Sequence, residues 1–137
     1  MIANYQVKEA IVSILKSSAA LVAALPDGSQ GIRERGWRGD VFQYPCVRVD
    51  LESQRDITDG FCPPVEQDWS VYVFSEKHSS READLIAGII ANLFQGRFYN
   101  NNGIKFIRVR ILENIPAIPE DEITWRAQVR CQSVIQA

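Results

Sequence analysis

The sequence contains very little of the side-chain chemistry that enzymes use. Its 137 residues include a single histidine, His78, which lies at the start of an expected helix and is best explained as a surface residue. No Gly-x-Ser-x-Gly motif surrounds a serine. The three cysteines, Cys46, Cys62 and Cys131, lack the Cys-x-x-Cys spacing of zinc and redox sites and are predicted to be free, mostly structural thiols. We therefore expect no catalytic residues and no enzymatic activity.

Motifs for phosphate, dinucleotide and metal binding are also missing. The glycines of "GIRERGWRGD" (31–40) match neither a P-loop, which needs Gly-Lys-Ser or Gly-Lys-Thr, nor the dinucleotide fingerprint that follows a strand. The carboxylates of Glu120, Asp121 and Glu122 are consecutive, so in extended backbone they alternate sides and do not converge on one cation. The sequence predicts no cofactor and no metal ion.

The chain lacks an excess of positive charge, a secretory leader and a long apolar run. Its formal net charge is −2, whereas nucleic-acid-binding domains usually have a basic bias. No apolar segment approaches the ~20 residues needed to cross a bilayer, and no cationic leader with a cleavage site is present. We expect a protein that is made and kept in cytosol-like conditions and has no membrane partner.

The composition that remains is that of an ordinary globular domain. Hydrophobic residues make up 46% of the chain and charged residues 23%, which is typical of soluble proteins. A chain of 137 residues is long enough to bury one hydrophobic core and too short for two domains of usual size. We predict a single domain that spans residues 1–137.

Two segments have the periodicity of amphipathic helices. The opening segment "NYQVKEAIVSILKSSAALVAAL" (4–25) places its apolar residues on one stripe, with a break near its two consecutive serines. The second segment begins at a capping-box pair, Ser79 and Glu82, and ends at Gly96. A glycine inside a helix is unfavourable, so Gly88 indicates close approach by another backbone.

Alternation of polar and apolar residues predicts four strands. They are "CVRVDLES" (46–53), "QDWSVYVFS" (67–75), "IKFIRVRIL" (104–112) and "ITWRAQVRCQSV" (123–134). The segments "QRDITDGFCPPV" (54–65) and "NIPAIPEDE" (114–122) are expected to be loops, and a further short strand near Ile32 or Val41 is left open. The predicted fold is α+β, with a mostly antiparallel β-sheet, two main α-helices packed on one face, and the order α-β-β-α-β-β.

Arginine is the conspicuous residue of the polar sheet face. In the third strand Ile107, Val109 and Ile111 are expected on one side, and Phe106 lies with the arginines on the other. Across the sheet this face would carry Arg48, Arg108, Arg110, Arg126 and Arg130, together with Asp50 and Glu52. Such a face is either simply solvated or a protein interface, because the planar arginine fork pairs well with carboxylates of a partner.

The loop "GIRERGWRGD" allows two interpretations. Arg33, Arg35 and Arg38 could contact phosphates while Trp37 stacks on a base, as in a small nucleic-acid-binding module. Alternatively the arginines pair with nearby acids and Trp37 anchors the loop against the core or a protein partner. Three arginines offset by Glu34 and Asp40 supply little net charge, which favours the second interpretation.

Several stretches together resemble the tail terminator, or tail-completion, proteins of long-tailed bacteriophages. These stretches are "SILKSSAALVAALPDG" (13–28), "YPCVRVDLES" (44–53), "WSVYVFSEKHSSREADLIAGIIANLFQG" (69–96), "IKFIRVRILE" (104–113) and "ITWRAQVRCQ" (123–132). The resemblance covers nearly the whole chain and consists of patterns of polar and apolar positions. It implies an α+β subunit of a ring, commonly a hexamer, in the neck region of the virion, assembled in the bacterial host cytoplasm.

The resemblance also implies partners and a role. Such a ring caps the tail tube, stops its polymerisation and offers a surface for head–tail joining, so its partners are the tube protein, the neck and connector proteins, and a sheath if the tail is contractile. DNA passes through the ring without sequence-specific binding. Another neck, connector or baseplate role is the alternative within the same class.

A ring needs two different patches on each subunit that meet head to tail. The arginine-rich loop and sheet face are the candidates for one patch, and the acidic segment from Glu113 to Glu122 for the other. The candidate interface residues are Arg33, Arg35, Trp37, Arg38, Arg48, Arg108, Arg110, Arg126, Arg130, Glu113, Glu120, Asp121 and Glu122.

Overall fold

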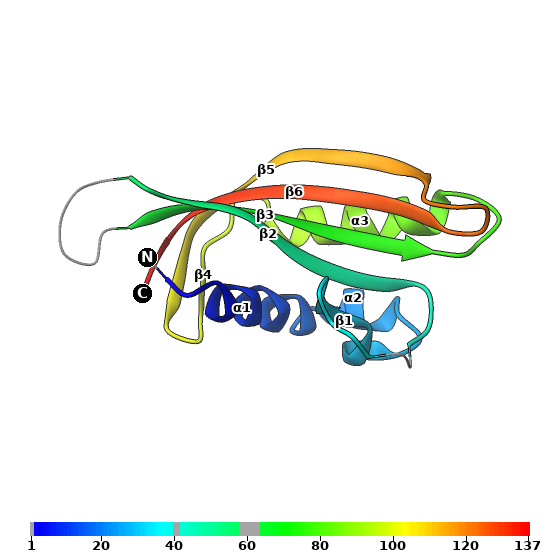
Figure 1. The fold of residues 1–137 in the computed structure, drawn as a ribbon, viewed down its shortest axis with the longest axis horizontal. Helices are drawn as coiled ribbons and strands as arrows, with labels where there is room; N and C mark the ends of the chain where they lie inside the picture. The colour runs from blue at the N-terminus through cyan, green and yellow to red at the C-terminus, as the bar shows by residue number, and fades with distance from the viewer. Residues whose placement is uncertain (1, 40–41, 58–63) are drawn as a thin grey trace.

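The computed structural model describes residues 2–39, 42–57 and 64–137 (Figure 1). The helices are α1 (Asn4–Lys16), α2 (Ala19–Ala23), the 3-10 helix η1 (Gly28–Gly31) and α3 (Arg81–Phe94). The strands are β1 (Ile32–Glu34), β2 (Cys46–Asp56), β3 (Val65–Ser75), β4 (Tyr99–Asn101), β5 (Ile104–Pro119) and β6 (Trp125–Gln136). None of the helices in the described ranges is long and apolar enough to span a bilayer.

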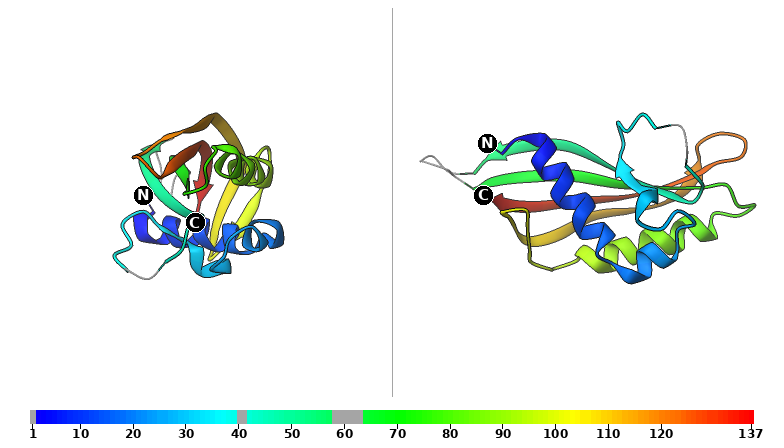
Figure 2. Two further views of the ribbon diagram at one scale, coloured as in Figure 1. Left: turned by 90° about the vertical axis from the view of Figure 1, so that its right-hand side faces the viewer. Right: turned by 90° about the horizontal axis from the view of Figure 1, so that it is seen from below.

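The six strands form one curled sheet in the order β1-β2-β3-β6-β5-β4. Strand β1 runs parallel to β2, and all other neighbouring pairs are antiparallel. Helices α1 and α3 lie on the same side of the sheet (Figure 2). The two helices therefore divide the sheet into an inner face, which they cover, and an outer face that points away from them.

The core fills the space between the helices and the inner face. Aliphatic side chains from α1, α3 and the central strands are completely buried there. Trp69 of β3 is 0% exposed, and its ring makes edge contacts with Phe94 of α3 and Phe106 of β5, both at a centroid distance of 5.8 Å. Because burial of apolar surface is the main favourable term in folding, this aromatic cluster fixes how α3 sits on the sheet.

The predicted fold class is wrong. The molecule is mostly β, with a six-stranded mixed sheet and three α-helices, so neither the helix-packed antiparallel α+β class nor the order α-β-β-α-β-β applies. The short strand near Ile32 is present as β1, and its parallel pairing beside β2 makes the sheet mixed. Strand β4 exists because Asn102 and Gly103 both take positive φ, at 53° and 78°, and so form a two-residue hairpin turn.

Strand β5 is much longer than the sequence pattern predicted. It continues through the proline-containing segment 114–119, which was expected to be a loop. Strand β4 pairs only with residues 104–106, so the rest of β5 is an edge of the sheet. Proline is tolerated on an edge strand because its missing N–H is not needed by a neighbour. β2 likewise extends three residues further than expected, to Asp56.

A β-bulge changes which side chains of β5 are buried. The pairing with β6 shifts between Ile107 and Arg110, and Arg108 within the bulge has a φ of 45°. Phe106 and Val109 are therefore both buried, and Ile107 is 40% exposed. The expected alternation across 106–111 is wrong at this point, because a bulge inserts an extra residue and changes the face on which later side chains lie.

The start and middle of α3 also differ from expectation. Ser80, not Ser79, is the N-cap, and its side chain makes no capping hydrogen bond. Glu82 instead accepts a hydrogen bond of 2.7 Å from the hydroxyl of Ser75 at the end of β3. Gly88 was expected to mark a close backbone contact, but a Cβ added there would meet nothing within 4 Å among the described atoms.

Candidate protein-interaction surface

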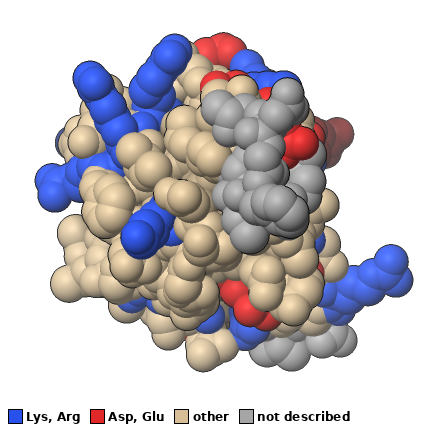
Figure 3. All heavy atoms as spheres, turned by 90° about the vertical axis from the view of Figure 1, so that its left-hand side faces the viewer, with Lys and Arg blue, Asp and Glu red and all other residues tan. Residues whose placement is uncertain are grey.

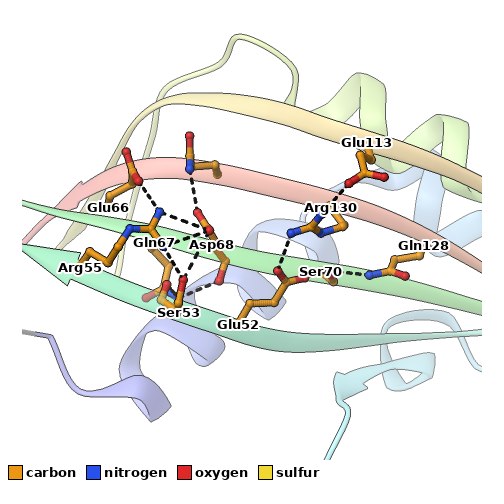
Figure 4. Close-up of polar contacts among 11 residues, drawn as sticks. Glu52, Ser53, Arg55, Glu66, Gln67, Asp68, Ser70, Glu113, Gln128 and Arg130 are labelled. Carbon is orange, nitrogen blue, oxygen red and sulfur yellow. Dashed lines mark hydrogen bonds and ion pairs between the residues drawn. The ribbon is translucent and has the colours of Figure 1, made fainter.

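The outer face of the sheet is polar and rich in ion pairs. Arg130 lies at its centre, with one guanidinium nitrogen 3.1 Å from Glu52 of β2 and the other 2.5 Å from Glu113 of β5 (Figure 4). Ser70 donates to Glu52, and Gln128 donates to the Ser70 hydroxyl at 2.9 Å. The hydrogen bonds that Arg130 donates to Glu52, and next to Glu113, raise the pKa of Arg130 above its usual value. This network ties together β2, β3, β5 and β6.

A second ion-pair cluster lies toward the β2–β3 hairpin, at a position where the sequence pattern predicted a loop. Arg55 pairs with Glu66 and lies 3.4 Å from Asp68 (Figure 4). The side-chain amide of Gln132 on β6 donates to Asp68 at 3.0 Å. Sequence reasoning missed this cluster because residue 55 was placed outside the strand. A register shift between Leu51 and Ser53 also moves Arg55 out of the alternation that precedes it in β2.

Two further predicted interface arginines are paired within the chain. Arg126 lies 3.2 Å from Glu120, and Arg35 lies 3.6 Å from Asp50. The acidic segment and the arginine-rich face, which were expected to meet between subunits, are thus also joined within one subunit through Glu120 and Glu113.

Arg48 is the predicted surface arginine that the structure buries. It is 8% exposed, and its Nη1 donates to the carbonyl oxygens of Gly31 at 3.0 Å and Val47 at 2.9 Å. The guanidinium also lies 5.4 Å from the ring centroid of Trp37 and 5.3 Å from that of Phe42. Arg48 therefore attaches the arginine-rich loop to the sheet and is not free to contact a partner.

The arginine-rich loop is folded onto itself and onto the outer face. Arg33 donates to the carbonyl and side-chain oxygens of Gln30 at 3.0 and 2.6 Å, and lies 4.6 Å from the centroid of Trp37. Arg35 lies 4.4 Å from the ring of Tyr72. Two guanidinium groups thus contact Trp37, which does not favour its use as a stacking platform for a base. Arg38 is exposed, and the expected partner Asp40 lies outside the described residues.

The remaining candidates, Arg108, Arg110, Asp121 and Glu122, are exposed. Asp121 is held by its own hairpin turn, because its carboxylate accepts the backbone N–H groups of Ile123 at 2.9 Å and Thr124 at 2.8 Å. These backbone hydrogen bonds lower the pKa of Asp121 below its usual value. Within the described part of the chain, no group of three or more histidine, cysteine or acidic side chains is arranged to hold a metal ion.

The two described cysteines are buried, and Cys62 lies outside the described residues. Burial raises the pKa of the Cys131 thiol to about 12, and burial also raises that of Cys46, with partial opposition from Arg48. Since the thiolate is the reactive form, a raised pKa makes both thiols unreactive near neutral pH.

Alkylation of a Cys62→Ser variant tests the burial of these thiols. At pH 8 we expect almost no labelling by iodoacetamide in the folded protein, since a pKa of about 12 leaves on the order of one thiolate in ten thousand at Cys131. Both thiols should react fully in concentrated urea. Mass spectrometry counts the adducts, and equal labelling rates in the two conditions would contradict the described burial.

Comparison with known proteins supports the fold. No protein-family model matches the sequence, and no curated protein matches it. A chain in a solved structure described as "Virion of native gene transfer agent (GTA) particle" has a TM-score of 0.76 at 14% identity, over 95% of this chain and 94% of that chain. A second solved chain, whose name carries no functional description, has a TM-score of 0.64 at 15% identity, over 100% of this chain and 98% of its own. At these identities the comparisons establish a shared fold over nearly the full length.

Proposed function

We propose that this protein is a structural subunit of a phage-like virion and, more specifically, a single-domain tail terminator that assembles as a ring, commonly of six copies. The ring would cap the tail tube, stop its polymerisation and offer the surface for head–tail joining. The observation that carries the proposal is the likeness in fold, over 95% of the chain, to a chain of a gene transfer agent virion. The sequence resemblance to tail terminators supports the finer role.

The surface is consistent with a subunit whose partners are proteins. Eight large hydrophobic side chains among the described residues are exposed, including Leu85 at 64% and Ile123 at 65%. Three of the eight, Tyr5, Phe42 and Phe98, are aromatic, and aromatic side chains are enriched at protein interfaces. In the proposed ring the tube protein and the head-side neck proteins would contact the two ends, a sheath would surround it if the tail is contractile, and DNA would pass through without being read.

The candidate interface residues remain part of this proposal. Arg126, Arg130, Glu113 and Glu120 already pair within the chain, so they would contribute shape and hydrogen bonds to an interface more than net charge. The nucleic-acid alternative is weaker, because Arg33 and Arg48 both contact the ring of Trp37. The experiment described next distinguishes a neck position from a baseplate position.

Deleting the reading frame from the phage-like element that encodes it tests the proposed role. We expect tails of excessive and variable length without heads in electron micrographs, because nothing would stop tube growth. Supplying the intact frame in trans should restore uniform tails, and a frame with an early stop codon should not. Normal tails joined to heads after deletion would rule out a terminator, and particles that lack a baseplate instead would assign the protein to the other end.

A further inference from the structure

We propose that the acidic tip of the β5–β6 hairpin of one copy docks on the basic start of β5 in the next copy. The acidic tip comprises Ile118, Glu120, Asp121, Glu122 and Ile123. The basic patch comprises Arg97, Phe98, Lys105, Ile107, Arg108 and Arg110. This contact specifies how neighbouring subunits meet. That the subunits form a ring rests on the function proposed above.

The basic patch is built from two adjacent segments of backbone. The N–H of Val109 on β5 donates to the carbonyl of Arg97 at 2.9 Å, which holds the connection between α3 and β4 beside β5. All four basic side chains of the patch are exposed, and none takes part in an ion pair among the described residues. Figure 3 shows lysine and arginine side chains gathered at one side of the end of the molecule that carries the chain termini.

The basic patch also contains exposed apolar side chains. Phe98 is 59% exposed and Ile107 is 40% exposed. Ile107 follows the buried Phe106 and faces outward, and the bulge that begins after Ile107 brings Arg108 to the surface as well. Arg108 has a positive φ, which is uncommon for a residue other than glycine and belongs to the local geometry of the bulge.

The acidic tip has the complementary composition. Ile118 is 44% exposed and Ile123 is 65% exposed, on either side of the three consecutive carboxylates. The hydrogen bonds from the backbone to Asp121 fix the turn, and the indole N–H of Trp125 donates to the carbonyl of Lys77 at 3.1 Å, which holds the hairpin against the end of β3. The tip is therefore ordered before it binds, which lowers the entropy lost on docking.

A shallow hollow beside the tip suits an arginine side chain. It has a volume of about 310 Å³, and Glu76, Asp121, Glu122 and Trp125 are among its lining residues. Carboxylates bind a guanidinium through paired hydrogen bonds, and an aromatic ring attracts it through its face. Lys77 also lines the hollow and offsets part of the negative charge. An arginine of the basic patch in the next copy is the group that this hollow would hold.

The two surfaces cannot meet within one chain. Arg110 lies near the middle of β5 and Glu120 directly follows the strand, so they are ten residues apart, which corresponds to roughly 30 Å of extended strand. Contact between them therefore needs two molecules, and it joins different patches of identical subunits. Such a head-to-tail contact repeats from copy to copy and closes into a ring when the rotation allows it.

Charge reversal on each surface tests the contact. Glu122→Lys and Arg110→Glu change exposed side chains that make no ion pair in the described structure. Each variant alone should self-associate at least about tenfold more weakly than the unaltered protein, because like charges then face each other. An equimolar mixture of the two variants should recover assembly, since each supplies the surface that the other lacks. Sedimentation velocity at low salt measures the association.

The controls are Glu9→Lys on α1 and Arg81→Glu on α3, which make the same charge changes on exposed residues elsewhere. They should assemble as the unaltered protein does. A protein that stays monomeric at about 1 mM, variants that assemble normally, or a mixture that fails to recover would each overturn the proposed contact. If both charge-reversed variants still terminate tails normally, the proposed contact is wrong and the proposed function stands. If the protein forms rings that depend on these charges but is not needed for tail formation, the contact stands and only the tail role is wrong.

Discussion

Replacing Trp69 with alanine is expected to lower the free energy of unfolding by about 3–5 kcal/mol, because it removes the largest buried side chain and leaves a cavity. Trp69 is 0% exposed and lies between Phe94 of α3 and Phe106 of β5. Loss of the ring would remove contacts to both at once, so α3 should loosen from the sheet. Urea denaturation followed by circular dichroism measures the change.

Trp69→Phe is the matched control. The indole nitrogen of Trp69 is buried and has no hydrogen-bond partner among the described atoms, so phenylalanine gives up no hydrogen bond there. It keeps an aromatic ring against Phe94 and Phe106 and should cost less than half as much as alanine. An alanine variant within about 1 kcal/mol of the unaltered protein would show that this aromatic cluster does not organise the core.

The inner core could be predicted from the sequence because it depends on local periodicity. Alternation places Trp69, Val71 and Val73 on one face of β3, and the structure buries all three. The 3.6-residue spacing of α3 likewise indicates most of its buried side chains, although Ile89 and Leu93 are only partly buried. Each pattern reflects how neighbouring residues of one element point relative to a single apolar layer. No knowledge of strand order is needed for that step.

The sheet topology could not be predicted because it depends on pairing between distant segments. Strand β1 is three residues long, so its parallel contact with β2 has no periodic signal of its own. The prolines at 116 and 119 are normal loop signals, and they are compatible with β5 only because that part of the strand has no strand on its other side. The bulge at Arg108 likewise depends on the pairing of β5 with β6 and left no mark in the alternation.

The candidate surface was also only partly predictable from the sequence. The sequence identified the arginines of the outer face, because alternation alone places Arg126 and Arg130 opposite the core. It did not identify their partners, since Glu52 and Glu113 come from strands on either side of the central pair. It also treated Arg48 as exposed, because periodicity reports the face of a strand and not whether a loop covers that face.

Replacing Arg48 with alanine should have the second large effect, about 2–4 kcal/mol of stability, because two buried carbonyl oxygens lose their shared donor. The guanidinium also fills the space between Trp37 and Phe42, so the loop that follows β1 should detach from the sheet. Trypsin should then cleave after Arg35 and Arg38 about tenfold faster or more, since cleavage needs local opening of the loop.

Two controls separate this local anchoring from the general loss of an arginine. Arg38→Ala removes an exposed arginine from the same loop and should change stability by less than about 0.5 kcal/mol. Arg48→Lys keeps the positive charge and one donor, so its stability should fall between those of the unaltered protein and the alanine variant. If Arg48→Ala keeps both the stability and the trypsin resistance of the unaltered protein, the loop is held by its other contacts, among them the pairing of Arg35 with Asp50 at 3.6 Å.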